Sequence, residues 1–100
     1  MRAVVYRGFS KEEMEFHFNP TVAVPDYPWW AKERSKASLR VRKTLKSWLN
    51  VPYGSNPRQV MDIFPADHPG APVNVYIHGG YWRGGCKDDN CHMAEAFVKA

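Results

Sequence analysis

Apolar residues recur every four positions in the middle of the chain. Ala37, Val41 and Leu45 follow this spacing, Leu49 continues it, and basic side chains occupy the other positions. A period close to 3.6 residues places the apolar side chains in one stripe along a helix. The pattern therefore predicts a fairly long amphipathic helix from Ala31 to about Trp48.

A shorter helix is expected near the amino terminus. Ser10 and Glu13 are spaced as in a capping box, in which the serine hydroxyl accepts a backbone N–H and the glutamate carboxylate accepts one in return. This signature predicts a helix that starts after Ser10 and runs to about Phe16 or His17.

Proline governs the segment between these two helices. Asn19-Pro20 ends the first helix, and Pro25 and Pro28 fall within the next segment, Thr21–Pro28. Each proline lacks a backbone donor and biases the residue before it away from the helical region. We therefore expect an extended arm over Thr21–Pro28.

The chain changes character after Asn50. Gly54-Ser55-Asn56-Pro57 is a turn cluster, and Gln59 to Phe64 reads as a strand whose hairpin partner is Trp48 to Tyr53. Pro65 to Pro72 is rich in proline and poor in apolar side chains, which indicates a connection on the surface.

A third strand is predicted at Val73–Ile77, an apolar run with β-branched residues that suits burial on both faces. It opens into a glycine-rich loop from His78 to Gly85. Asp88 or Asp89 is then expected to cap a helix. Apolar residues recur along one side of that helix, at Met93, Ala96, Phe97 and Ala100.

This order of elements is the entrance to an α/β sheet. Open α/β sheets bind ligands beyond the carboxyl ends of their strands, which is where the glycine-rich loop would lie. We therefore expect residues 1–100 to be one incomplete α/β domain. Residues 1–50 would be a helical arm, and residues 51–100 would hold the first strands, the loop and the start of a helix.

Composition and charge narrow the class of protein. The chain is 44% hydrophobic and 14% aromatic, as in globular proteins. The amino terminus does not resemble a secretory signal, and no apolar run approaches the ~20 residues that span a bilayer. We expect a soluble, cytoplasmic protein with no membrane partner.

The net charge of +4 comes from a single segment. Seven bases there face one acid, Glu33, so this segment carries +6 and the remainder carries −2. A solvated helix face explains such a cluster better than a nucleic-acid site, because no stacking pattern or nucleic-acid motif accompanies it. The bases are Lys32, Arg34, Lys36, Arg40, Arg42, Lys43 and Lys46.

The two cysteines give a weak metal signal. Cys86 and Cys91 are five positions apart, and His92 follows the second. Structural zinc sites need four ligands, so a site here would have to recruit His78 or residues beyond the sequence. We expect two ordinary thiols, no metal and no organic cofactor.

The glycine-rich loop carries a family resemblance. His78-Gly79-Gly80-Tyr81-Trp82 matches the His-Gly-Gly-x-Trp signature of the kynurenine formamidase (arylformamidase) branch of the α/β-hydrolase fold and of its carboxylesterase relatives. The chain resembles the amino-terminal third or so of such enzymes. Further matches lie at Tyr6–Phe9, Phe18–Pro20, Val24–Asp26, Val51–Gly54 and Asp62–Pro65.

The resemblance implies a role for the loop. The backbone N–H groups of Gly80 and Tyr81 would form an oxyanion hole, as two glycines after a strand also suggest on physical grounds. His78 would order the loop and would not be the catalytic base. The side chains of Tyr81 and Trp82 would either line the active site or only pack against the rest of the fold. Arg83 could contact a carboxylate of the substrate.

The catalytic triad is missing from these 100 residues. No Gly-x-Ser-x-Gly nucleophile turn occurs, because none of the five serines has a glycine two positions away on both sides. Four aspartates are candidates for the acid, but without a nucleophile they are better explained as turn, strand-surface and capping residues. They are Asp26, Asp62, Asp88 and Asp89.

The expected activity belongs to the complete protein. The complete protein would hydrolyse a small N-formyl aryl amine, such as N-formylkynurenine, or a carboxylic ester. Its binding partner would be that small acyl substrate, and the complete protein could also form a homodimer. A non-catalytic interaction module and, last, a nucleic-acid binder are the alternatives. An isolated chain that is molten or aggregates would indicate a fragment, whereas a cooperative monomer would favour the module.

Overall fold

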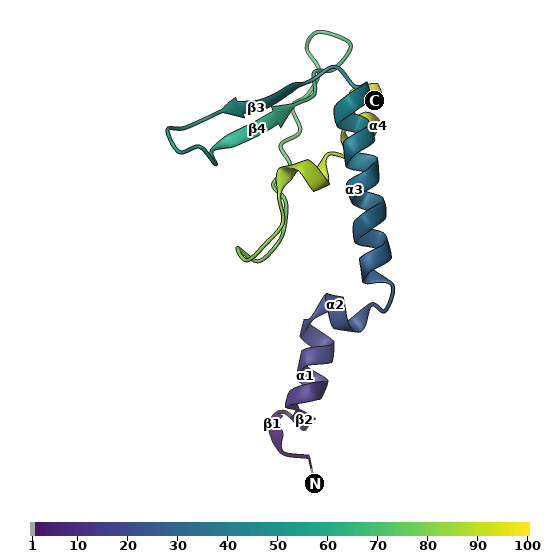
Figure 1. Ribbon diagram of the computed structural model, residues 1–100, viewed down its shortest axis with the longest axis vertical. Helices are drawn as coiled ribbons and strands as arrows, with labels where there is room; N and C mark the ends of the chain where they lie inside the picture. Colours follow the sequence, from purple (N-terminus) through teal and green to yellow (C-terminus); the bar gives the residue numbers. More distant parts are fainter. Residues whose placement is uncertain (1) are drawn as a thin grey trace. The chain divides into compact units, whose positions relative to one another are not determined.

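The computed structural model describes residues 2–100 and divides the chain into two compact units (Figure 1). The first is Met1–Lys32 and the second is Glu33–Ala100. The long helix α3, Tyr27–Thr44, begins in the first unit and ends in the second. Each unit is described by itself below.

The first unit opens with a small hairpin that the apolar pattern did not predict. Strands β1, Val4–Tyr6, and β2, Phe9–Ser10, are antiparallel. The two residues between them, Arg7 and Gly8, have φ angles of 44° and 87°. Positive φ at both central positions is the geometry of the tight turns that match the twist of hairpin strands.

Helix α1, Lys11–Phe18, confirms the prediction from the capping box. The Ser10 hydroxyl accepts the Glu13 N–H at 3.3 Å, and the Glu13 carboxylate accepts the Ser10 N–H at 2.7 Å. These reciprocal bonds satisfy two backbone donors that the helix start would leave unpaired. The hydrogen bond from Ser10 lowers the pKa of the Glu13 carboxyl.

The prediction of an extended arm at Thr21–Pro28 is wrong. Helix α2, Pro20–Ala23, follows α1, and α3 already begins at Tyr27. Pro20 and Pro28 both lie in the first turn of a helix, where a missing N–H costs nothing. The Asn19 side chain also caps α2, because its Oδ1 accepts the Thr21 N–H at 3.1 Å.

Helix α3 starts and ends about four residues earlier than Ala31 to Trp48. The predicted apolar stripe is confirmed at Val41, which is 1% exposed. Ser38 is also fully buried, and its hydroxyl accepts the N–H groups of Cys91 and His92, both at 3.1 Å. This serine therefore joins α3 to a segment more than 50 residues away in the sequence.

The predicted hairpin after α3 is confirmed. Strands β3, Trp48–Pro52, and β4, Val60–Ile63, are antiparallel and lie side by side in Figure 1. Gln59 holds the turn: its carbonyl accepts the Tyr53 N–H at 2.9 Å, and its side-chain oxygen accepts the Asn56 N–H at 2.9 Å. Gly54 leaves room for this side chain, since a Cβ there would collide with it.

The prediction of a buried strand at Val73–Ile77 is wrong for this structure. The segment pairs with no other strand among residues 2–100, and Val73 and Ile77 are 88% and 85% exposed. A central strand forms only where neighbours supply hydrogen bonds on both edges. The apolar composition of the segment is therefore not matched by burial here.

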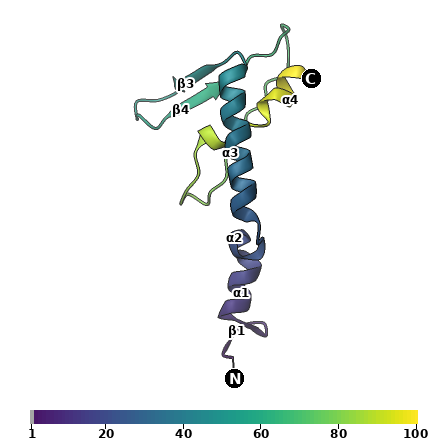
Figure 2. The same ribbon diagram turned by 45° about the vertical axis from the view of Figure 1, so that its right-hand side comes forward.

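The carboxyl-terminal helix also differs from the prediction. Asp88 and Asp89 lie inside a 3₁₀ helix, η1, Lys87–Asn90, and do not cap the helix after it. Helix α4, Ala94–Lys99, starts later and runs beside α3 (Figure 2), where the Arg40 guanidinium lies 3.3 Å from the Glu95 carboxylate.

Few apolar side chains are buried. Val41 and Cys91 are the buried hydrophobic residues of the described part of the chain, whereas Trp82 is 98% exposed. No helix among residues 2–100 has the length and apolar character that crossing a membrane requires.

Candidate functional site

The predicted oxyanion loop forms a tight turn. The Gly80 carbonyl accepts the Arg83 N–H at 2.9 Å, and the two residues between them, Tyr81 and Trp82, have φ angles of 51° and 56°. This left-handed conformation costs a residue with a Cβ roughly 1–2 kcal/mol. Backbone strain of this kind is concentrated at functional sites in proteins.

Two glycines make this turn possible. Gly80 has a φ of 143°, and a Cβ on it would collide with the Gly84 carbonyl. Gly85 has a φ of 85°, and a Cβ there would lie 2.8 Å from the Gly79 carbonyl oxygen. The chain segments that enter and leave the loop thus approach so closely that no side chain fits between them.

The loop leaves backbone donors free. Within residues 2–100, the N–H groups of Gly80 and Tyr81 donate to no other group. The side chains of Tyr81 and Trp82 are 82% and 98% exposed, and their rings contact each other at a tilt, with centroids 5.9 Å apart. The turn can therefore offer two adjacent donors to an anionic atom.

His78 lies at the entrance of the loop. Its ring Nδ1 is 2.7 Å from the Gly79 carbonyl oxygen, so it donates a hydrogen bond there when Nδ1 carries the proton. This contact orients the ring against the backbone of the loop. None of the serine hydroxyls in the described chain bonds to a histidine ring; the Ser35 hydroxyl, for example, donates to the Asp89 carboxylate at 2.8 Å.

An ionic cluster, which sequence analysis missed, follows the loop. Asp62 was expected on the surface of a strand, but its side chain is only 4% exposed. Its carboxylate lies 2.8 Å from the Arg42 guanidinium, 2.8 Å from the Lys87 ammonium and 2.9 Å from the Asn50 N–H. Asp88 binds the same two cations. We call these four charged residues the Asp62 cluster.

The Asp62 cluster joins three elements of the second unit. Arg42 lies on α3, Asp62 on β4, and Lys87 and Asp88 on η1. Burial opposes ionisation of Asp62, but the bonds from Lys87 and Asn50, with the Lys87 and Arg42 charges, lower the pKa of its carboxyl. The cluster therefore holds η1, directly after the loop, against α3 and β4.

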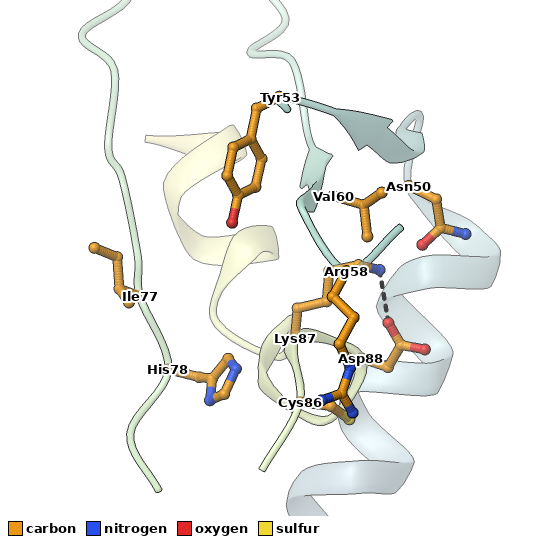
Figure 3. A pocket seen from close by; sticks show the side chains of 9 residues that line it. All are labelled: Asn50, Tyr53, Arg58, Val60, Ile77, His78, Cys86, Lys87 and Asp88. Atoms are coloured by element: carbon orange, nitrogen blue, oxygen red, sulfur yellow. Dashed lines mark hydrogen bonds and ion pairs between the residues drawn. The ribbon is translucent and has the colours of Figure 1, made fainter. Parts of the chain in front are cut away.

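A cavity of about 420 Å³ opens beside the loop, between the β3–β4 hairpin and η1 (Figure 3). Ile77 and His78 line one side of the view, and Arg58, Lys87 and Cys86 line the other. Apolar and charged side chains therefore both line this open cavity.

The remaining candidates do not assemble into a site. The Asp26 carboxylate accepts the Trp30 indole N–H at 2.8 Å, a contact local to the start of α3. Arg83 is exposed and does not line the cavity. Cys86 and Cys91 are free thiols, and no group of metal-binding side chains gathers among residues 2–100.

The basic segment does not form an uninterrupted cationic face. Lys36 pairs with Glu33 at 2.6 Å, Arg40 pairs with Glu95, and Arg42 belongs to the Asp62 cluster. These ion pairs reduce the charge available to a polyanion.

Two known proteins similar to this chain have the same name, although their sequence identity to it is low. The chain is 26% identical to a kynurenine formamidase of Danio rerio over 94% of its length, and 26% identical to a kynurenine formamidase of Salmo salar over 93%. No family model matches the chain, and no solved structure matches it. It spans 35% and 34% of the lengths of the two relatives. The chain is thus similar to about one third of a formamidase.

Proposed function

We propose that this chain is the amino-terminal part of a formamidase-like serine hydrolase with an α/β-hydrolase fold. Its substrate would be a small N-formyl aryl amine of the N-formylkynurenine type. The observation that carries the proposal is the similarity to two kynurenine formamidases over nearly the whole chain. The strained turn at Tyr81 and Trp82 supports it independently.

In this proposal the loop stabilises charge and does not attack the substrate. A serine outside residues 1–100 adds to the formyl carbon, and the carbonyl electrons move onto oxygen. The N–H groups of Gly80 and Tyr81 donate to that oxyanion. Donors held in place before the reaction cost no reorganisation when the charge develops, and loss of one typically lowers kcat about a hundredfold to a thousandfold.

The remaining steps need a base, also outside residues 1–100. A histidine takes the serine proton and returns it to the aryl amine, which leaves as the C–N bond breaks. Water then adds to the formyl-serine ester, and formate departs. No metal or organic cofactor takes part in this scheme.

The Asp62 cluster would support the loop mechanically. It fixes η1, which begins two residues after Gly85, to α3 and β4. A loop with strained φ angles needs anchored ends, because otherwise it would relax to unstrained angles. We infer that α3 and β4 help to hold Gly80 and Tyr81 in their donor positions.

A hydrolysis assay on the full-length protein tests the proposal. An aryl formamide and the matching aryl ester are each supplied, and formate and free acid are measured. We expect hydrolysis of the formamide with the larger kcat/KM, and its loss after treatment with a serine-directed organophosphate. Hydrolysis of the ester alone would favour a carboxylesterase, and no hydrolysis of either would refute the proposal.

A further inference from the structure

Ser38 carries a buried hydroxyl that the proposed reaction does not use. The residue is 0% exposed, and its oxygen accepts the backbone N–H groups of Cys91 and His92, both at 3.1 Å. Buried backbone donors that lose their acceptor are costly, because water cannot replace it. One oxygen on α3 thus satisfies two consecutive donors of a segment more than 50 residues away.

These two donors lie at the far end of the segment that leaves the glycine-rich loop. That segment runs from Gly85 through η1 to Cys91 and His92, just before α4. The Asp62 cluster fixes the first two residues of η1. Ser38 fixes the two residues directly after it. Both ends of η1 are therefore attached to neighbouring elements.

The two attachments differ in their physical nature. The Asp62 cluster consists of charges, and the Asp88 side chain in it is 54% exposed, so dissolved salt screens part of its attraction. The bonds to Ser38 join neutral groups, and this residue is closed to water. Ser38 thus supplies the part of the attachment that does not depend on ionic strength.

The segment that leaves the loop is in contact with the segment that enters it. A Cβ on Gly85 would lie 2.8 Å from the Gly79 carbonyl oxygen, and one on Gly80 would collide with the Gly84 carbonyl. Two backbone segments packed this closely cannot shift independently, because either one would run into the other. A displacement of η1 therefore reaches Gly80 through Gly85 and Gly84.

We propose that Ser38 is a positioning residue for the glycine-rich loop. Its hydroxyl anchors the segment that leaves the loop, and thereby keeps the N–H groups of Gly80 and Tyr81 in their donor positions. This role rests on the proposed function, in which these two groups stabilise the oxyanion. Because Ser38 is buried, it does not touch the substrate, and its loss should lower kcat without raising KM.

Amide hydrogen exchange on the full-length protein tests the anchor without any reaction. The wild type is compared with Ser38→Ala, which keeps the Cβ and places a strong helix former in α3. The amides of Cys91 and His92 should exchange at least about tenfold faster in this variant, because their acceptor is gone. Exchange at the wild-type rate would overturn the proposal.

Ser35→Ala is the matched control on the same helix. The Ser35 hydroxyl also bonds to η1, but it donates to the Asp89 carboxylate, which keeps the Cys86 thiol as a second donor and is partly open to water. Its loss should change the exchange of the same two amides by less than about twofold. An equal acceleration in the two variants would also overturn the proposal.

Kinetics tests the effect on the loop donors. An aryl formamide and the matching thioformamide are supplied to the wild type and to both variants. Sulfur accepts hydrogen bonds weakly, so hydrolysis of the thioformamide depends less on the two donors. Ser38→Ala should lower kcat about tenfold for the formamide and much less for the thioformamide, with both KM values unchanged. A loss of folded protein alone would lower both rates equally.

The outcomes separate the positioning role from the proposed function. If the wild type hydrolyses the formamide and Ser38→Ala lowers both rates equally or not at all, the positioning role is refuted and the proposed function stands. If the wild type hydrolyses neither substrate, the proposed function fails and the positioning role fails with it. Amide exchange then still shows whether Ser38 anchors the segment.

Discussion

Single residues set the chemistry that the loop and its surroundings can support. Gly80 accepts a φ of 143° where the Gly84 carbonyl leaves no room for a Cβ, and Tyr81 and Trp82 take left-handed angles despite their large side chains. The two cysteine thiols likewise differ in their immediate surroundings. Cys91 is 6% exposed and Cys86 is exposed, although only five positions separate them.

The two cysteines should therefore differ in reactivity. Burial raises the pKa of the Cys91 thiol, and the nearby Asp62 carboxylate raises it further. Thiolate is the reactive form, so we expect Cys86 to react with iodoacetamide at least about tenfold faster than Cys91 in the native full-length protein. Peptide mass spectrometry over a time course measures both rates, and equal rates would place Cys91 at the surface.

At the scale of elements, the local signals could be predicted and the distant contacts could not. The capping box of α1 and the turn of the β3–β4 hairpin lie within a few residues of sequence. Arg42, Asp62 and Asp88 meet across separations of 20 and 46 residues, and no spacing rule reveals such a contact. Pro28 misled the prediction of an extended arm, because a proline in a first helical turn and one in an extended arm look alike in sequence.

In the candidate site, too, features set by neighbouring residues could be predicted from the sequence, and features that depend on distant residues could not. The run from His78 to Trp82 indicates a donor loop because glycine permits the required angles in any context. The cavity that contains Arg58 could not be predicted, since its lining comes from three segments between Asn50 and Asp88. The strand expected at Val73–Ile77 depends on neighbouring strands, and its sequence does not supply them.

Removing the central carboxylate of the Asp62 cluster should disconnect α3, β4 and η1. Asp62→Ala leaves Arg42 and Lys87 without a buried partner, and breaking such a pair costs about 3 kcal/mol. We expect that loss in urea unfolding of the full-length protein. Asp67→Ala is the control, because this exposed side chain should change the unfolding free energy by less than about 0.5 kcal/mol. Equal effects of the two substitutions would contradict a structural role for the cluster.

At the scale of the whole molecule, these 100 residues bury little apolar surface. Val41 and Cys91 are the buried hydrophobic residues among 2–100, whereas Val73, Ile77 and Trp82 are at least 85% exposed. Ordering each residue costs roughly 1–2 kcal/mol of backbone entropy, and apolar burial is the main term that offsets it. Such a chain needs further surface against which to pack.

The isolated chain 1–100 should therefore not unfold cooperatively. We expect a broad thermal transition by circular dichroism and strong fluorescence of a bound hydrophobic dye, as in a molten state. Attaching the rest of the full-length protein should sharpen the transition and remove the dye signal. A sharp, reversible transition of monomeric 1–100 would instead favour an autonomous interaction module.

Formamide hydrolysis by the full-length protein and two glycine variants tests the central claim most directly. Gly80→Ala puts a Cβ into the Gly84 carbonyl, whereas Gly84→Ala meets no atom within 4 Å and has an ordinary φ. Displaced oxyanion donors should lower kcat at least about a hundredfold in Gly80→Ala, with KM little changed, and Gly84→Ala should stay close to the wild type. Retention of full activity in Gly80→Ala, or an equal loss in both variants, would contradict the role assigned to Gly80 and Tyr81.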